Sequence, residues 1–195
     1  MKLNSELRQE ARNVLSGQWV MAALAAFVYI AITSVPNAIP GVGTIGTLLL
    51  LPLGYGFGVL FLKVFRGQEL NIGSLFDGFQ EYGRILGTLL LQSVYTFLWM
   101  LLLIVPGVIK WYSYSMTTYI LLDEPDLKHN AAIERSMAMM EGHKMRLFLL
   151  DLSFIGWAIL SIFTFGIGMF FLQAYVSTAH AAFYEDLKGN APVAA

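Results

Sequence analysis

The sequence has no cysteine and few charged residues. Without cysteine the chain can form no disulfide, no thiolate nucleophile and no cysteine metal site. Charged residues make up 13% of its 195 residues, whereas soluble domains carry roughly 25%. Hydrophobic residues reach 57%, a composition that suits lipid better than water as a solvent. The net charge of −1 gives no global electrostatic reason to bind nucleic acid, so we expect no such partner.

Long stretches without Asp, Glu, Lys or Arg predict membrane-spanning helices. Apart from Lys110, residues 85–122 carry no such charge, and residues 147–184 carry only Asp151; each stretch has 38 residues. As one helix, 38 residues would reach about 57 Å, nearly twice the bilayer core of about 30 Å. Each stretch is therefore expected to fold in the middle and cross twice. Turn-forming residues lie near the middle of these stretches and of residues 18–62: Pro40-Gly41, Pro106-Gly107 and Phe165-Gly166.

The predicted fold class is all-α: a polytopic membrane protein with six transmembrane helices arranged as three helical hairpins. The spans are expected at about 18–35, 45–63, 86–105, 108–123, 147–164 and 168–184. Gly41, Gly107 and Gly166 are the expected turn residues. The apolar run from Trp19 to Val35 is longer than a signal-peptide core and has no cleavage site at its end, so it is interpreted as an uncleaved first span.

The positions of Lys and Arg predict that both termini are cytoplasmic. In that orientation eleven of the twelve basic residues lie in or beside the cytoplasmic segments 1–17, 64–85, 124–146 and 185–195. Only Lys110 falls on the other side, where its side chain can reach the far interface. The positive-inside rule favours this orientation over its opposite.

A weak internal repeat accompanies the hairpins. An amphipathic stretch precedes each apolar block, at residues 3–16, 74–86 and 129–141, and we expect each to be an interfacial helix. The chain is thus predicted to be a single membrane domain, 1–195. Its quasi-repeats of interfacial helix, span, turn and span cover about 1–66, 71–123 and 129–188.

Asp151 is the one carboxylate well inside an apolar block. It lies 15 residues before Gly166, and His180 lies 14 residues after it, so a hairpin turning there places both at a similar depth. A charge in the membrane needs a partner, and we expect Asp151 and His180 to pair or to share a polar pocket with Ser177 and Arg146. The pair can be structural, pinning the hairpin, or part of a proton relay; the structural role is favoured because one pair is not a pathway.

Other candidates are uncharged. Gln92, Tyr95 and Gln173 could line a polar interior, although such residues more often hydrogen-bond neighbouring helices. Gly54 and Gly58 form a small-residue face that suits internal helix packing or a homo-oligomer contact.

Two further patterns carry little weight. Residues 41–46 match the dinucleotide motif G-x-G-x-x-G but follow a predicted helix instead of a strand, so they are expected to serve a turn. The acids near Pro125 have no diagnostic metal-ligand spacing. No cofactor and no metal are expected.

Several segments resemble one known family. They share uncommon combinations of aromatic, glycine and methionine residues: Leu98–Leu102, Ile104–Lys110, Tyr112–Met116, Leu122–Pro125, Ser136–Gly142, Leu152–Trp157 and Ala182–Tyr184. Together these are similar to the bacterial integral membrane family called domain of unknown function 975, over most of the chain. Where that family often has Pro-Tyr in the last span, this sequence has Ala174-Tyr175, which puts a kink there in doubt.

The resemblance implies a bacterial cytoplasmic membrane but no activity. No catalytic constellation is evident, so we expect a non-enzymatic membrane protein that acts through membrane lipids or protein partners. The alternative is a transporter or channel for a small solute or lipid, which the repeat and the polar residues within spans permit. An intramembrane enzyme ranks last, because it would need several titratable groups converging on one pocket.

Overall fold

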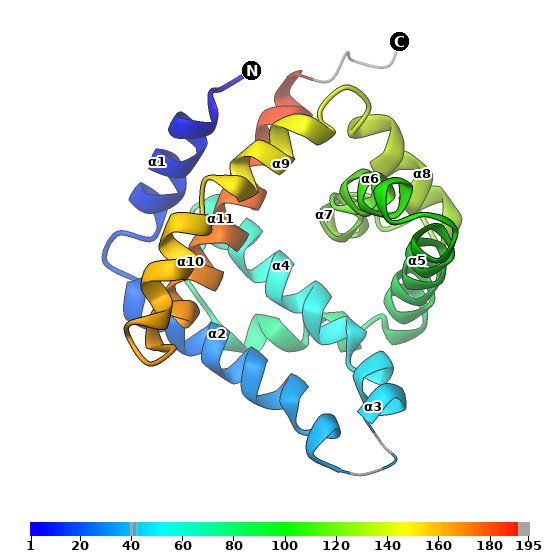
Figure 1. Cartoon of the computed structure of the whole chain (residues 1–195), viewed down its shortest axis with the longest axis horizontal. Helices are drawn as coiled ribbons and strands as arrows, with labels where there is room; N and C mark the ends of the chain where they lie inside the picture. The colour runs from blue at the N-terminus through cyan, green and yellow to red at the C-terminus, as the bar shows by residue number, and fades with distance from the viewer. Residues whose placement is uncertain (40, 42, 191–195) are drawn as a thin grey trace.

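The computed structural model describes residues 1–39, 41 and 43–190, and every regular element in these residues is a helix. The helices are α1 (Asn4–Val14), α2 (Trp19–Ser34), η1 (Pro36–Ala38), α3 (Gly43–Leu49), α4 (Leu51–Phe65), η2 (Ile72–Phe79), α5 (Tyr82–Leu102), α6 (Ile104–Tyr114), α7 (Thr117–Asp123), α8 (Asn130–Met139), α9 (Lys144–Leu152), α10 (Ile155–Ile162) and α11 (Ile167–Asn190). Figure 1 shows α4 near the centre, α5 to α8 on one side of it, and α1, α9, α10 and α11 on the other.

Three helical stretches are long and apolar enough to cross a membrane: Trp19–Ala38, Tyr82–Leu102 and Lys144–Ile162. The pair α3 and α4, bent by 42°, is a fourth candidate if it counts as one span. These four stretches correspond to four of the six predicted spans, with ends shifted by a few residues. At this coarser level, the prediction of helices long and apolar enough to span a membrane is confirmed for three stretches, and for a fourth if the bent pair counts as one.

The predicted spans 108–123 and 168–184 are not among these candidates. The first is divided at Ser115 into two short helices, α6 and α7. The second lies within α11, which has 24 residues and is long enough, but polar residues such as Gln173 and His180 lower its mean hydropathy.

Ser136 of α8 occupies the break between α6 and α7. Its hydroxyl accepts a hydrogen bond from the Met116 N–H (3.2 Å) and donates one to the Ser113 carbonyl (2.9 Å). A side chain thereby satisfies backbone groups that the broken helix leaves free, as a buried break requires. Ser136 is fully buried, so this face of α8 packs against α6 and α7. The helix itself lies within residues 129–141, where an amphipathic helix was predicted.

Two of the three predicted turn glycines adopt turn conformations. Gly41 and Gly166 have φ of 82° and 84°, which favour glycine. Pro40, predicted beside Gly41, lies outside the described residues. The prediction for Gly107 is wrong: the turn is at extended Leu103, and Gly107 lies inside α6. Pro106 did not end a helix because it stands in the first turn, where no N–H is needed.

Gly107 instead brings two helices together. A Cβ at this position would lie 2.8 Å from the Met100 Cα, so its absence lets α6 approach α5 closely.

The small-residue face of α4 is covered within the chain. A Cβ on Gly54 would lie 3.6 Å from the Tyr29 hydroxyl of α2, and one on Gly58 would lie 3.0 Å from Thr118 of α7. Between them, Gly56 faces the backbone of η2. This is the internal-packing role of the two predicted for Gly54 and Gly58. It makes α4 the hub on which α2, η2 and α7 pack.

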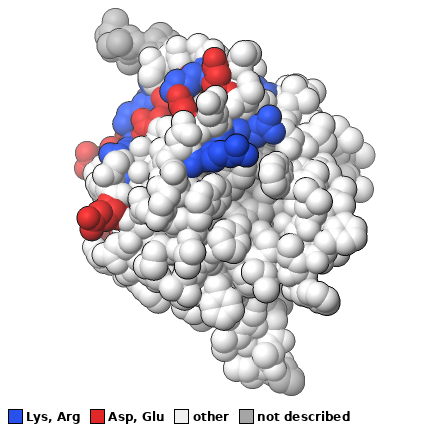
Figure 2. Space-filling model, turned by 90° about the vertical axis from the view of Figure 1, so that its left-hand side faces the viewer, with Lys and Arg blue, Asp and Glu red and all other residues white. Residues whose placement is uncertain are grey.

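Charged and apolar surfaces are separated. Figure 2 shows Lys, Arg, Asp and Glu gathered towards one end of this face, with a large uncharged surface beyond them. Large apolar side chains are exposed along α5 and around the α10–α11 turn, where Leu101 is 74% and Phe165 99% exposed. A continuous apolar surface of this extent suits contact with lipid.

Candidate functional site

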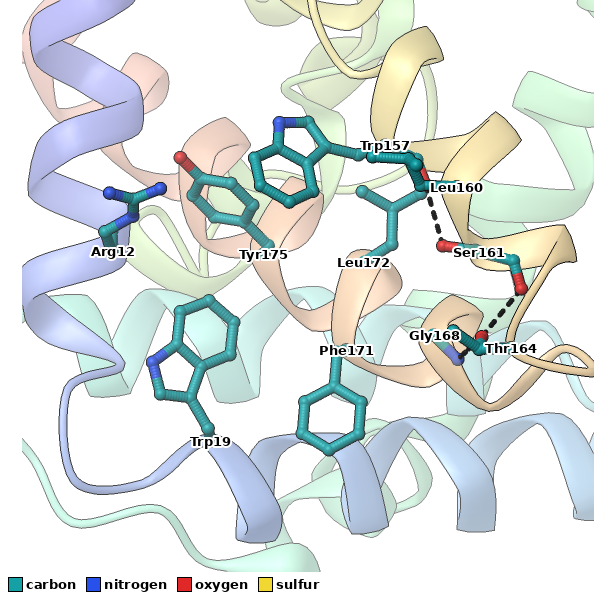
Figure 3. Close-up of a pocket in the computed structure, with 10 residues that line it drawn as sticks. All are labelled: Arg12, Trp19, Trp157, Leu160, Ser161, Thr164, Gly168, Phe171, Leu172 and Tyr175. Atoms are coloured by element: carbon teal, nitrogen blue, oxygen red, sulfur yellow. Dashed lines mark hydrogen bonds between the residues drawn. The ribbon is translucent and has the colours of Figure 1, made fainter.

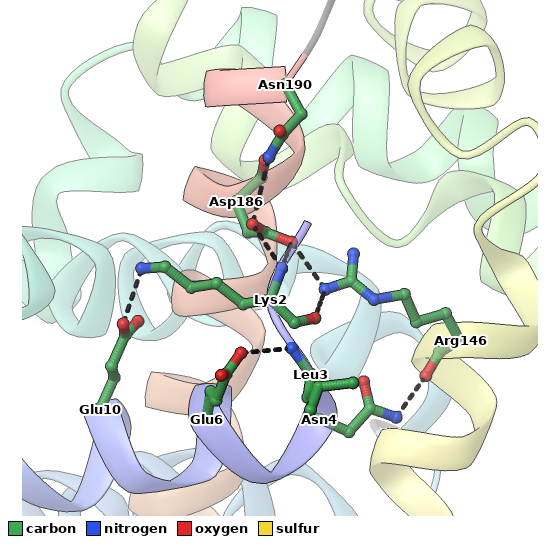
Figure 4. Close-up of polar contacts among 8 residues, drawn as sticks. All are labelled: Lys2, Leu3, Asn4, Glu6, Glu10, Arg146, Asp186 and Asn190. Carbon is green, nitrogen blue, oxygen red and sulfur yellow. Dashed lines mark hydrogen bonds and ion pairs between the residues drawn. The ribbon is translucent and has the colours of Figure 1, made fainter.

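Asp186 near the end of α11 anchors the N-terminal segment. Its carboxylate is 3% exposed and accepts hydrogen bonds from the Lys2 N–H (3.1 and 3.2 Å) and from Arg146 Nη2 of α9 (2.6 Å). Arg146 Nη2 also donates to the Lys2 carbonyl, and the Asn4 amide donates to the Arg146 carbonyl. Figure 4 shows these groups converging from α1, α9 and α11. The contacts fix the start of α1 against the bundle.

Burial alone would raise the pKa of the Asp186 carboxyl. The hydrogen bonds from Arg146 and the Lys2 N–H outweigh that effect and hold the pKa below its usual value. The Arg146 guanidinium is therefore bound to Asp186. The prediction that it shares a pocket with Asp151 is wrong, because the guanidinium reaches towards α1 and the end of α11.

The middle of α1 also lies on α11. The Tyr175 hydroxyl donates to the Arg8 carbonyl (3.0 Å), and Leu7 and Ala11 are fully buried. Beside this buried face, α1 carries Arg8 and Arg12 one helical turn apart, and both line a pocket with Tyr175 of α11.

Arg8 and Arg12 are not paired with acidic side chains in the part of the chain that the structure describes. Within the described residues, neither Arg8 nor Arg12 has a carboxylate within salt-bridge distance. The Arg8 Nε is buried and has no hydrogen-bond partner there. Two guanidinium groups without a carboxylate partner at the edge of an apolar surface offer hydrogen-bond donors suited to an anion.

An apolar groove begins at Arg12 and runs between α10 and α11. Its volume is about 380 Å³, and its lining is aromatic and aliphatic apart from Arg12 and two hydroxyl residues: Arg12, Trp19, Trp157, Leu160, Ser161, Thr164, Gly168, Phe171, Leu172 and Tyr175. A smaller polar pocket of about 290 Å³ adjoins it and shares Arg12, Trp157 and Tyr175. Figure 3 shows Trp19, Trp157 and Tyr175 around the end of the groove at which Arg12 lies.

Hydrogen bonds keep the far end of the groove apolar. The Ser161 hydroxyl donates to the Trp157 carbonyl (2.8 Å), and the Thr164 hydroxyl donates to the Ser161 carbonyl (2.7 Å). The Gly168 N–H donates in turn to the Thr164 hydroxyl (2.8 Å). These hydroxyl groups are turned towards the backbone, so the groove combines a basic mouth with an apolar channel.

A second pocket surrounds the predicted pair. His180 Nε2 lies 2.5 Å from Asp151 Oδ1, which confirms the pairing predicted from their equal spacing around Gly166. The Tyr112 hydroxyl donates to the other oxygen, Oδ2 (3.1 Å). The pocket measures about 450 Å³ and lies among α5, α6, α9 and α11; its remaining lining is apolar or aromatic: Met100, Val108, Trp111, Phe154 and Val176.

Comparison with known families decides where the chain belongs. The model of the family described as "Protein of unknown function (DUF975)" matches residues 1–113 and 100–191, which together cover nearly the whole chain. The chain belongs to this family. No curated protein and no solved structure matches the sequence of this DUF975 protein.

The DUF975 structure separates the other predicted polar residues. Ser177 does not line the Asp151 pocket, and Gln173 is exposed on α11, so the prediction of a polar interior fails for Gln173. Gln92 lines a different pocket of about 400 Å³ beside Trp111, and its buried Oε1 has no partner within the described residues. Tyr95 is half-buried on α5 and lines neither pocket.

Asp123 joins three helix ends that are far apart in sequence. Both its oxygens accept from Arg66 after α4 (2.6 and 2.7 Å), and Oδ2 also accepts from Tyr184 (2.9 Å) and Lys188 (2.7 Å) of α11. Burial raises the pKa of Asp123, but these hydrogen bonds, that of Arg66 first, outweigh it and lower the pKa to about 2. The carboxylate thus serves an ion-pair network.

Sequence reasoning missed the groove. The amphipathic pattern of residues 3–16 predicted an interfacial helix but not its contact with α10 and α11. The available signal was a basic i, i+4 pair on a helix that precedes an interfacial Trp19. Pairing these residues with α10 and α11 required the fold.

Proposed function

We propose that this DUF975 protein is a non-enzymatic protein of the bacterial cytoplasmic membrane that binds an anionic phospholipid in the groove between α1, α10 and α11. The headgroup phosphate would lie against Arg8 and Arg12, and an acyl chain would follow the apolar channel. The proposal includes six membrane crossings and cytoplasmic termini, so that the basic mouth lies at the level of the inner-leaflet headgroups.

The adjacency of two unpaired arginines to an apolar channel carries this proposal. A free anion would need the basic mouth but no channel, and an apolar molecule would need the channel but no arginines. A phospholipid uses both. The aromatic rim of Trp19, Trp157 and Tyr175 adds amphipathic rings, which favour the headgroup level of a bilayer.

The six-crossing arrangement is supported by lengths and charges. Residues 104–123 would span about 30 Å as α6 and α7 together, and α11 would span about 36 Å. The break at Ser115 is compatible with a membrane because Ser136 satisfies the backbone there. Charged residues gather at one end, as Figure 2 shows for one face.

The test compares lipid binding by native mass spectrometry of the full chain. Purified protein is offered equal amounts of phosphatidylglycerol and phosphatidylethanolamine, and the ratio of the two bound forms is measured. We expect the wild type to prefer the anionic lipid. The double substitution Arg8→Gln with Arg12→Gln should lower that preference at least tenfold, since each basic residue near an anionic headgroup contributes about 1 kcal/mol.

The matched control is the double substitution Lys128→Gln with Lys144→Gln. Neither lysine forms a salt bridge within the described residues, and both lie away from the groove. It removes the same charge and should leave the lipid preference unchanged. Equal losses in both double variants would show that net charge and not the groove selects the lipid, and the proposal would be abandoned.

A further inference from the structure

The pocket around Asp151 differs in chemistry from the lipid groove. Asp151 and His180 are its ionisable pair, and aromatic rings of Trp111, Tyr112 and Phe154 form much of its wall. We propose that this pocket binds an organic cation, a quaternary or protonated amine, and that His180 releases one proton when the cation enters. The proposal does not depend on lipid binding at the groove.

The Asp151 carboxylate has free capacity for a ligand. An ionised carboxylate offers about four acceptor positions on its two oxygens. His180 occupies one position on Oδ1, and Tyr112 occupies one on Oδ2. The remaining positions are open to a cation that enters the pocket, so binding does not require either hydrogen bond to break.

Charge balance explains why a proton leaves. In an apolar setting a carboxylate needs a countercharge, and without a ligand protonated His180 supplies it to Asp151. When a cation arrives, it supplies that charge instead, and protonated His180 becomes an unfavourable neighbour. The Nδ1 proton then passes to solvent while Nε2–H keeps its hydrogen bond to Asp151. The pocket contains one negative and one positive charge before and after binding.

The aromatic wall fits a cation better than a neutral molecule. Rings of Trp, Tyr and Phe attract a cation placed over their faces. A 450 Å³ pocket that combines such rings with one carboxylate has the composition used to recognise amines. Trp111 is 60% exposed, so this wall lies at the entrance and can be altered without disturbing the core.

Among the residues that the structure describes, few other ionisable groups lie close to the pair. The phenol of Tyr112 on α6 contacts Asp151 directly. The helices α2 and α10, which also pack on α11, carry no Asp, Glu, Lys, Arg or His. On α4, Lys63 is bound to Asp77, and the charged residues of α1 lie at the Asp186 anchor or the groove. His180 is therefore the group positioned to release the proton.

Titration calorimetry of the purified full chain tests both parts of the proposal. The probe is tetraethylammonium, which has no proton of its own to exchange. Titrations near neutral pH in two buffers of different ionisation enthalpy give the affinity and the number of protons released. We expect the wild type to release about one proton per cation, and Asp151→Asn to bind at least tenfold more weakly. His180→Gln should bind without releasing a proton.

The matched control is Ser177→Ala, one turn from His180 on α11 and outside the pocket lining, which should behave as the wild type. If Asp151→Asn does not fold, Trp111→Leu tests the site instead. We expect its affinity for tetraethylammonium to fall about fivefold, because one cation–π contact is removed. The site would be overturned if the wild type did not bind tetraethylammonium. It would also be overturned if folded Asp151→Asn or Trp111→Leu bound it as tightly as the wild type. Binding by the wild type without proton release would overturn the exchange.

Discussion

Single carboxylates at the charged end connect helices that lie far apart in the sequence. Asp123 contacts Arg66 and Lys188, and Asp186 contacts Lys2 and Arg146. Both carboxyl pKa values are lowered by these partners. Since a lowered pKa in the folded protein means that folding favours the ionised form, the protein should be sensitive to acid.

The direction in which Asp123 makes stability depend on pH follows from its pKa values in the folded and unfolded chain. Its pKa is about 2 in the folded chain, against about 3.9 for an unfolded aspartate. The stabilisation is fully present above about pH 5 and is lost progressively as the pH falls through about 2, amounting to about 2–3 kcal/mol. Melting temperatures of wild type and Asp123→Asn in detergent should therefore differ at pH 6 and converge at low pH.

The control for this pH series is Asp126→Asn, because Asp126 is exposed and forms no salt bridge within the described residues. Its difference from the wild type should be small at every pH. A difference in melting temperature between wild type and Asp123→Asn that stays constant down to pH 2 would contradict the role of ionised Asp123.

At the scale of helices, α4 depends on a residue with no side chain. A Cβ on Gly56 would lie 1.9 Å from the Leu75 carbonyl oxygen of η2. The obstacle is backbone, so it cannot rotate away. Gly56→Ala should separate α4 from η2. It should lower the free energy of unfolding by about 3 kcal/mol, the upper range for overpacking. Thermal unfolding in detergent measures the loss.

Gly54→Ala is the matched control on the same helix. Its Cβ would meet only the Tyr29 hydroxyl at 3.6 Å, an ordinary contact. Alanine is the better helix former, so stability should stay the same or rise by about 0.5–1 kcal/mol. Equal destabilisation by both substitutions would mean that contact with η2 is not what Gly56 provides.

Sequence patterns predicted helices better than their junctions. The pairing of Asp151 with His180 was predictable because both lie nearly equally far from Gly166, and a hairpin puts equal distances at equal depth. The position of the turn at Leu103 was not predictable, because proline early in a helix is favourable and proline between helices looks the same in sequence. The partner of Arg146 was not predictable either, since Asp186 is 40 residues away on another helix.

At the scale of the whole molecule, the absence of cysteine makes topology directly testable. Single cysteines can be introduced at Phe165, which is 99% exposed in the α10–α11 turn, and at Gln68, exposed after α4. A membrane-impermeant maleimide applied to intact spheroplasts should label Phe165→Cys and leave Gln68→Cys unlabelled. Lysis should expose both.

The reverse labelling pattern would place the termini outside, and labelling of both sites in intact spheroplasts would rule out cytoplasmic termini with six crossings. The unmodified chain serves as the blank for this experiment, because it offers no thiol to the reagent.

The Asp186 anchor also constrains the order of assembly in the cell. Lys2 leaves the ribosome 184 residues before the carboxylate that holds it. Until α11 has been made this anchor is missing, and in the proposed topology Lys2, Arg8 and Arg12 can face the anionic bilayer surface. The Lys2 N–H gains its hydrogen bonds to Asp186 only once α11 is present. The segment before α1 can therefore reach its anchor only after α11 has been made.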